Sequence, residues 1–172
     1  MSQYKRCYYP GGCYFFTLVT YQRQPILIKT GNIKNLKNAI NKVKLSYPFT
    51  LSALVILPDH LHLLLKLPDK DTDFSTRIRL IKRYFSINQN TYSNNRNEKY
   101  VWQRRFWEHL IYNEDDWKIH FDYIHYNPVK HGYVKNVSDW PFSSFHYWLT
   151  RGIYDIEWGS LEPTSLAAFK RE

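Results

Sequence analysis

The hydrophobic positions of the chain follow two different spacings, which predict an alternation of strands and helices. Runs rich in aromatic, β-branched and other apolar residues are typical of strands and span residues 13–21, 51–57, 60–67 and, more weakly, 106–112. Apolar residues three and four positions apart predict helices over residues 32–45, 73–92 and 114–127. A turn at Pro58-Asp59 joins the two central strands into a hairpin.

The ends of the helices carry their own signals. Asp73 and Asn113 are suitable N-caps for the two later helices. Pro128 disfavours helical geometry at the residue before it, so the last long helix is predicted to end near Asn127. A short aromatic helix is expected over residues 142–150. The order strand, helix, strand, strand, helix, strand, followed by extra helices, predicts an α+β protein: a ferredoxin-like sandwich with a four-stranded antiparallel sheet.

No internal repeat or linker divides the 172 residues, so we predict one domain over residues 1–158. Residues 159–172 are expected to form a loosely ordered C-terminal tail, and residues 93–99 a polar loop. The longest apolar run is only a few residues, and no signal-peptide core follows the polar N-terminus. We therefore expect a cytoplasmic, nucleoid-associated protein with no membrane partner.

Charge and aromatic content narrow the class of partner. The net charge is +9, with 24 Lys and Arg against 15 Asp and Glu, which favours a polyanion such as nucleic acid or an anionic membrane. Aromatic residues make up 18% of the chain; most belong in a core, but exposed rings stack on unpaired bases. The combination favours single-stranded nucleic acid, without distinguishing binding from cutting. The only cysteines, Cys7 and Cys13, are too few for a disulfide framework and are expected to be free thiols.

The sharpest local pattern is the run PDHLHLLL at residues 58–65. On a strand, His60 and His62 project from one face, and the alternating leucines project into the core on the other. Two imidazoles placed in this way can both bind one divalent ion. An ordinary amphipathic strand with two solvent-facing histidines gives the same pattern, so the spacing alone does not choose between them.

A third ligand has to come from another element, and the helix over residues 114–127 offers candidates. Tyr123 and Asn127 are four residues apart and therefore share a face. Asn127 supplies an amide oxygen, and Tyr123 a phenol that could act as a nucleophile. Equally, Asn127 is an ordinary helix-end residue before a proline, and Tyr123 is one of fifteen tyrosines. On chemistry alone, three neighbours are as acceptable: Tyr126, His120 and His125.

Five runs, in order along the chain, carry a resemblance to a known family. They are YYPGG at 8–12, LPDHLH at 57–62, VWQRRFWEH at 101–109, DYIHYNPVKHG at 122–132 and SDWPFSS at 138–144. With these runs the chain resembles the REP-associated tyrosine transposases, a domesticated branch of the single-tyrosine HUH transposases with an IS200-like domain. The resemblance extends from about Tyr4 to Trp158, and the run at 122–132 is its most distinctive part.

The resemblance implies a role for each candidate. His60 and His62 would be the two HUH metal ligands, Asn127 the third ligand, and Tyr123 the nucleophile. The implied enzyme is a metal-dependent endonuclease and strand-transferase that cuts single-stranded DNA at REP hairpins through a 5′-phosphotyrosine intermediate. Mixed imidazole and amide ligation suits Mg²⁺ or Mn²⁺.

Further expectations concern DNA contacts and assembly. Six basic residues are candidate phosphate contacts, with an ordinary solvated surface as the alternative: Arg77, Arg79, Lys82, Arg83, Arg104 and Arg105. We expect a monomer or a homodimer. Three other functions remain open: a non-catalytic module that binds single-stranded nucleic acid, a hydrolase that uses a metal-bound water, and a structural nucleoid protein.

Overall fold

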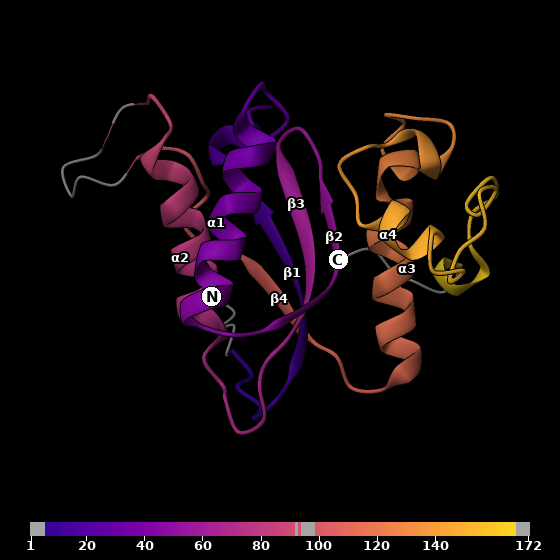
Figure 1. The fold of residues 1–172 in the computed structure, drawn as a ribbon, viewed down its shortest axis with the longest axis horizontal. Helices are drawn as coiled ribbons and strands as arrows, with labels where there is room; N and C mark the ends of the chain where they lie inside the picture. The colour runs from indigo at the N-terminus through magenta and orange to yellow at the C-terminus, as the bar shows by residue number, and fades with distance from the viewer. Residues whose placement is uncertain (1–5, 92, 94–98, 168–172) are drawn as a thin grey trace, which may run out of the picture.

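The computed structural model describes residues 6–91, 93 and 99–167, and a four-stranded sheet lies at its centre. The strands are β1 Cys13–Val19, β2 Thr50–Ile56, β3 His60–Lys66 and β4 Trp107–Leu110. All neighbouring pairs are antiparallel, in the order β2-β3-β1-β4. Helices α1 (Asn32–Ser46) and α2 (Phe74–Ile87) cover one face, and α3 (Glu114–Lys130) and α4 (Phe145–Leu149) lie on the other (Figure 1). The predicted ferredoxin-like α+β sandwich is confirmed.

Side chains along the central strands point alternately to the two faces of the sheet, and this divides the apolar residues into two cores. Tyr14, Phe16 and Leu18 of β1 pack under α1 and α2, together with the odd-numbered leucines 61, 63 and 65 of β3. Phe15 and Leu64 point to the opposite face and pack under α3. The side chains at positions 60 and 62 therefore share the face of Leu64 and lie toward α3.

Both predicted helix caps are confirmed. The Asp73 carboxylate accepts a hydrogen bond from the main-chain N–H of Thr76 (2.9 Å), and the Asn113 side chain accepts one from that of Asp116 (2.8 Å). The predicted end of the last long helix is wrong, because α3 continues through the buried Pro128 to Lys130. A proline this near the C-terminal end removes only one helical hydrogen bond, and the bond from His131 N–H to the Asn127 carbonyl (3.0 Å) keeps the last turn closed.

Several elements are shorter than predicted. The second helix ends at Ile87, the fourth strand covers only Trp107–Leu110, and the short aromatic helix covers only Phe145–Leu149. Most of the predicted loop at 93–99 lies outside the described residues, although Ser93 and Lys99 pair as an antiparallel bridge. Residues 168–172 of the predicted tail also lie outside them. Its described part includes a 3₁₀ turn at Thr164–Leu166 that packs on α3, so loose order of the tail stays a prediction.

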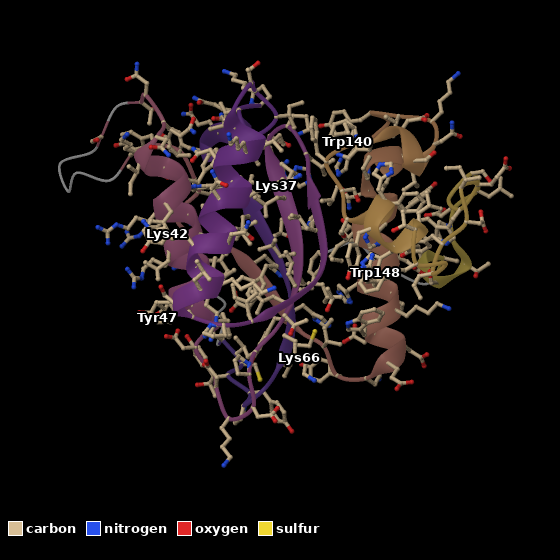
Figure 2. The ribbon with its side chains drawn as sticks, viewed as in Figure 1. Lys37, Lys42, Tyr47, Lys66, Trp140 and Trp148 are labelled. Atoms are coloured by element: carbon tan, nitrogen blue, oxygen red, sulfur yellow. The ribbon has the colours of Figure 1, made fainter. Side chains whose placement is uncertain are left out.

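The segment after α3 covers the sheet edge formed by β2. The Trp140 indole N–H donates to the Ile56 carbonyl (3.0 Å), and the Trp148 indole N–H donates to the Ser52 carbonyl (2.9 Å). Figure 2 shows both indoles between the sheet and the layer of α3 and α4. Covering an edge strand in this way blocks its pairing with another chain, and here it also ties the layer of α3 to the sheet.

Two further observations bear on the composition. Cys7 is exposed, Cys13 is half-buried, and both are free thiols. Burial raises the pKa of the Cys13 thiol to about 11, which makes it a poor nucleophile. Within the described ranges, no helix combines the length and the apolar character that crossing a membrane requires.

Candidate active site

The histidine pair lies on the central strand β3 and is covered by α3. His60 and His62 are each only 4% exposed, and their ring centroids are 5.1 Å apart. The alternative of two solvent-facing histidines on an amphipathic strand is therefore wrong for this chain. The pair instead faces the helix that carries the other sequence-predicted residues.

Each imidazole of the pair is fixed through its Nδ1 atom. His60 Nδ1 is 2.6 Å from Asp59 Oδ1, and His62 Nδ1 is 2.9 Å from Thr17 Oγ1. Such contacts orient a ring and leave its Nε2 directed elsewhere, as is usual for metal-binding histidines. Asp59 also pairs with Arg23 at 3.0 Å. Sequence reasoning did not assign a role to Thr17 or Asp59, although Asp59 stands directly before the pair.

The histidines are held in their neutral form. Burial lowers the pKa of His60 despite the opposing effect of Asp59. Burial lowers the pKa of His62 well below its ordinary value, and the positive charge of Lys130 acts in the same direction. A neutral imidazole with an available lone pair is the form that binds a metal ion.

Helix α3 brings Tyr123 to this pair and carries Asn127 on the same face. The Tyr123 ring centroid is 5.4 Å from that of His62, and the Lys130 ammonium lies over the Tyr123 ring at 4.3 Å from its centroid. Asn127 is fully buried one helical turn further on, and its Nδ2 is 3.5 Å from the Tyr123 carbonyl oxygen. The predicted candidates His60, His62, Tyr123 and Asn127 therefore come from two elements that pack against each other.

Two polar atoms at this site suit a cation. Within the described part of the chain, His62 Nε2 and Asn127 Oδ1 are buried without a hydrogen-bond partner. A buried acceptor without a partner costs about 1–3 kcal/mol, so such atoms are uncommon unless something else satisfies them. An imidazole nitrogen and an amide oxygen are both ligands of divalent metal ions, and the donor set therefore fits the metal that the family resemblance implies.

The three neighbours that were equally acceptable on chemistry alone, His120, His125 and Tyr126, lie in surroundings that differ from those of Tyr123 and Asn127. His125 is fully buried and contacts the Tyr154 hydroxyl (3.1 Å) and the Ser144 hydroxyl (2.8 Å). Burial lowers the pKa of His125 to about 3. Tyr126 packs in the apolar core between α3 and the C-terminal segment. His120 lies nearer the start of α3, beside Asp116.

One predicted phosphate contact requires correction. Arg77 is only 2% exposed, and its guanidinium donates to the carbonyl oxygens of Tyr47, Pro48 and Asp73 and to the Asp71 carboxylate. These contacts occupy the guanidinium, so Arg77 is a structural residue and is not available to a phosphate. It connects the start of α2 to the loop between α1 and β2.

The other five basic candidates lie at or near the surface, and those on α2 lie on the side of the sheet opposite the histidine pair. Arg79, Lys82 and Arg104 line a pocket of about 280 Å³ together with Arg6. The Lys82 ammonium donates to the Gln103 and Arg104 carbonyls (2.7 and 3.2 Å), and burial lowers its pKa to about 8. The remaining two, Arg83 and Arg105, are exposed.

A row of rings leads away from the histidine pair and was missed at the level of sequence. His131 lies 5.1 Å from His60, Tyr133 stacks on His131 at 5.9 Å, and Trp140 stacks on Tyr133 at 5.5 Å, all measured between ring centroids. His131 and Tyr133 are exposed. Sequence reasoning assigned no individual role to His131, Tyr133 or Trp140.

Comparisons with known proteins identify the class of protein that this fold and site define. The family model described as "Transposase IS200 like" matches residues 10–127, a span that contains the histidine pair, Tyr123 and Asn127. The chain therefore belongs to the IS200-like transposase family of DNA-processing enzymes.

Within that family, the chain is similar to the REP-associated tyrosine transposases. It is 46% identical to the REP-associated tyrosine transposase of Escherichia coli strain K12 over 171 residues, which cover 99% of this chain and 98% of the relative. A solved structure of a REP-associated tyrosine transposase bound to a REP hairpin matches it with a TM-score of 0.81. That match has 44% sequence identity and covers 96% of each chain.

Proposed function

We propose that this protein is a single-strand-specific DNA endonuclease and strand-transferase that acts on REP-type hairpins with Tyr123 as its nucleophile. The observation that carries the proposal is the contact of the Tyr123 ring with the buried His62, together with two buried acceptors suited to a cation, His62 Nε2 and Asn127 Oδ1. The hairpin substrate is supported by the similar transposase whose structure holds a REP hairpin.

The protein residues have separate roles in this mechanism. His60, His62 and Asn127 would hold a divalent ion, Mg²⁺ or Mn²⁺, which supplies positive charge against the scissile phosphate. The Tyr123 hydroxyl oxygen attacks phosphorus and loses its proton, and the 3′ oxygen of the preceding nucleotide leaves and takes up a proton. The products are a 5′-phosphotyrosine and a free 3′-hydroxyl. Lys130, held over the Tyr123 ring, adds positive charge where the phosphodiester would lie.

Rejoining follows from the chemistry of the phenol. A tyrosine phenol has a pKa near 10, far below that of a sugar hydroxyl, so phenolate is the better leaving group. An incoming 3′-hydroxyl can then displace Tyr123 and restore a DNA strand. The covalent bond preserves the free energy of the phosphodiester, and no nucleotide triphosphate is needed.

Two surface features match a hairpin with a single-stranded flank. The pocket formed by Arg6, Arg79, Lys82 and Arg104 concentrates positive charge suited to a phosphate backbone. The exposed rings of His131 and Tyr133 continue from His60 and are suited to stacking on unpaired bases next to the scissile phosphate.

The decisive experiment compares Tyr123→Phe with Tyr126→Phe. A labelled hairpin oligonucleotide with a single-stranded flank is incubated with each protein and Mn²⁺ and analysed on a denaturing gel. The wild type and Tyr126→Phe should form a denaturant-resistant adduct that maps to the peptide containing residues 122–130. Tyr123→Phe keeps the ring and should bind the hairpin normally, with neither adduct nor cleavage.

The same gel tests the metal ligands and the alternatives. His62→Ala should abolish cleavage while largely preserving binding, and Asn127→Ala should do so less severely because water can replace an amide oxygen. Cleavage without any adduct would indicate a hydrolase that uses a bound water. Hairpin binding with no cleavage under any condition would support the non-catalytic binding module.

A further inference from the structure

A second group of metal-ligating side chains lies near the start of α3. His109 on β4 and Asp116 and His120 on α3 each offer one ligand atom, and these three atoms lie within 4.8 Å of one another. His109 Nε2 is 2.9 Å from Asp116 Oδ2, and His120 Nδ1 is 3.0 Å from Asp116 Oδ1. The two imidazole rings stack with their centroids 4.6 Å apart. Among the described residues, no other set of three His, Cys, Asp or Glu side chains meets the same criterion.

A single aromatic ring connects this group to the candidate active site. The Phe15 ring centroid is 4.8 Å from that of His120 and 5.2 Å from that of His62. Phe15 also contacts the Tyr123 ring edge-on at 5.8 Å. The two clusters are therefore distinct, with no ligand in common, and α3 contributes residues to both.

We propose that His109, Asp116 and His120 form a second metal site, which binds a divalent ion of the zinc class. Two imidazoles and one carboxylate suit borderline ions such as Zn²⁺ and Co²⁺ better than Mg²⁺, which prefers oxygen ligands. The inference is independent of the proposed function, because it uses no residue assigned to the DNA reaction.

The spacing of the three side chains is close to that of ligands around one ion. Tetrahedral ligands at about 2.0–2.1 Å from zinc are roughly 3.3 Å apart. The distances from the two Asp116 carboxylate oxygens to the imidazoles, 2.9 and 3.0 Å, would need to open by only a few tenths of an ångström. His120 Nδ1 also lies 2.9 Å from the Asp116 main-chain carbonyl oxygen, so an ion bound at this nitrogen would replace its proton and this hydrogen bond. His120 is buried, whereas the side chains of His109 and Asp116 are 24% and 19% exposed, so an ion can enter from solvent.

The site would position the catalytic helix without touching substrate. Asp116, His120, Tyr123 and Asn127 follow one another at intervals of four, three and four residues, and therefore form a single stripe along α3. His109 belongs to β4, which pairs with β1. An ion bound to His109, Asp116 and His120 would thus fasten the first turns of the helix to the sheet, and hold Tyr123 in register with the histidine pair.

Metal binding by variants of the full chain tests this proposal without an activity assay. The protein is freed of metal with a chelator and titrated with Co²⁺, and bound cobalt is measured by equilibrium dialysis and visible absorption. His60→Ala combined with His62→Ala removes the candidate catalytic site and should leave one equivalent of cobalt bound. Adding His109→Gln should weaken that binding by roughly 100-fold or more, since even losing an outer-shell partner costs about 10–100-fold.

The matched control is His146→Gln in the same double variant. His146 is also half-buried and hydrogen-bonded, to the Trp140 carbonyl at 3.2 Å, but belongs to neither cluster. Its replacement should leave the cobalt equivalent intact. Circular dichroism of each metal-free variant shows whether it is folded.

The outcomes separate this site from the proposed catalytic one. If the His60→Ala, His62→Ala variant binds no cobalt, or binds it equally well after His109→Gln, the cluster is only a set of hydrogen bonds and the proposal is overturned. If His109→Gln does not fold, the cobalt form of the double variant is examined by NMR. Paramagnetically shifted imidazole N–H signals from two histidines support the site, and their absence overturns it.

Discussion

Replacement of Arg77 by Met should destabilise the fold and should not act on DNA directly. The guanidinium donates to the Pro48 carbonyl (2.7 Å), the Asp73 carbonyl (2.7 Å) and the Asp71 carboxylate (2.6 Å), and so connects the first turn of α2 to the loop that follows α1. The hydrogen bond from Arg77 lowers the pKa of the Asp71 carboxyl. Met keeps much of the length of the side chain but removes every donor.

The size of the effect follows from the groups left behind. A buried acceptor that loses its partner costs about 1–3 kcal/mol, whereas the Asp71 carboxylate left behind is 31% exposed, so losing its ion pair costs at most about 1 kcal/mol. Tyr47 and Pro48 are exposed enough for water to reach their carbonyls, so we expect about 3 kcal/mol. For a chain of this length, that corresponds to a fall in Tm of about 6–12 °C.

The control is Arg79→Met, on the same helix but exposed beside the basic pocket. It should change the free energy of unfolding by less than about 0.5 kcal/mol. It should, however, weaken hairpin binding and reduce the slope of log affinity against log salt by about one. Urea unfolding and fluorescence anisotropy measure the two effects. The reasoning is refuted if Arg77→Met unfolds like Arg79→Met and loses as much hairpin affinity.

Two further effects are expected. Burial lowers the pKa of His125 from 6.5 to about 3. Below pH 6.5 the unfolded state therefore binds a proton at His125 that the folded state does not, and the free energy of unfolding decreases as the pH is lowered. Between pH 7.5 and 5, His125 should account for a loss of about 2 kcal/mol in the free energy of unfolding. Urea unfolding of His125→Gln should therefore show a smaller loss over this range than the wild type. An equal loss in both proteins would assign the effect to other groups. Tyr133→Ala should weaken binding of a hairpin with a single-stranded flank roughly tenfold, but not binding of the hairpin alone, whereas Tyr147→Ala, exposed on α4, should change neither. Equal losses for both oligonucleotides would exclude stacking by Tyr133.

The arrangement of the histidine pair could be predicted from sequence because a strand alternates its faces by strict geometry. Leucines at 61, 63 and 65 had to enter one core, which sent His60 and His62 to the other face. What the strand could not reveal is that α3 covers that second face, since the cover comes from residues some sixty positions later. Burial of the pair is therefore a tertiary property.

The error on Arg77 is of another kind, because the sequence did contain the relevant signal. Arg77 is three residues after Phe74 and four before Ile81, on the same helical face as both. A basic residue in the apolar stripe of a helix is more consistent with an internal hydrogen-bonded role than with a phosphate contact. Its partners, the main-chain carbonyls of Tyr47 and Pro48, leave no trace in residue type, so only the structure could identify them.

The candidate site exists only when α3 is docked on the sheet. β3 supplies the histidines, α3 supplies Tyr123 and Asn127, and the two are held together by the core around Phe15, Phe121 and Ile124 and by the Trp140 indole bonded to the edge strand β2. A metal bound at His109, Asp116 and His120 would add a connection between α3 and β4 at the opposite end of the helix. Activity should therefore depend on residues that touch neither DNA nor the proposed catalytic metal, since a shift of about 1 Å in a nucleophile can cost about 100-fold in rate.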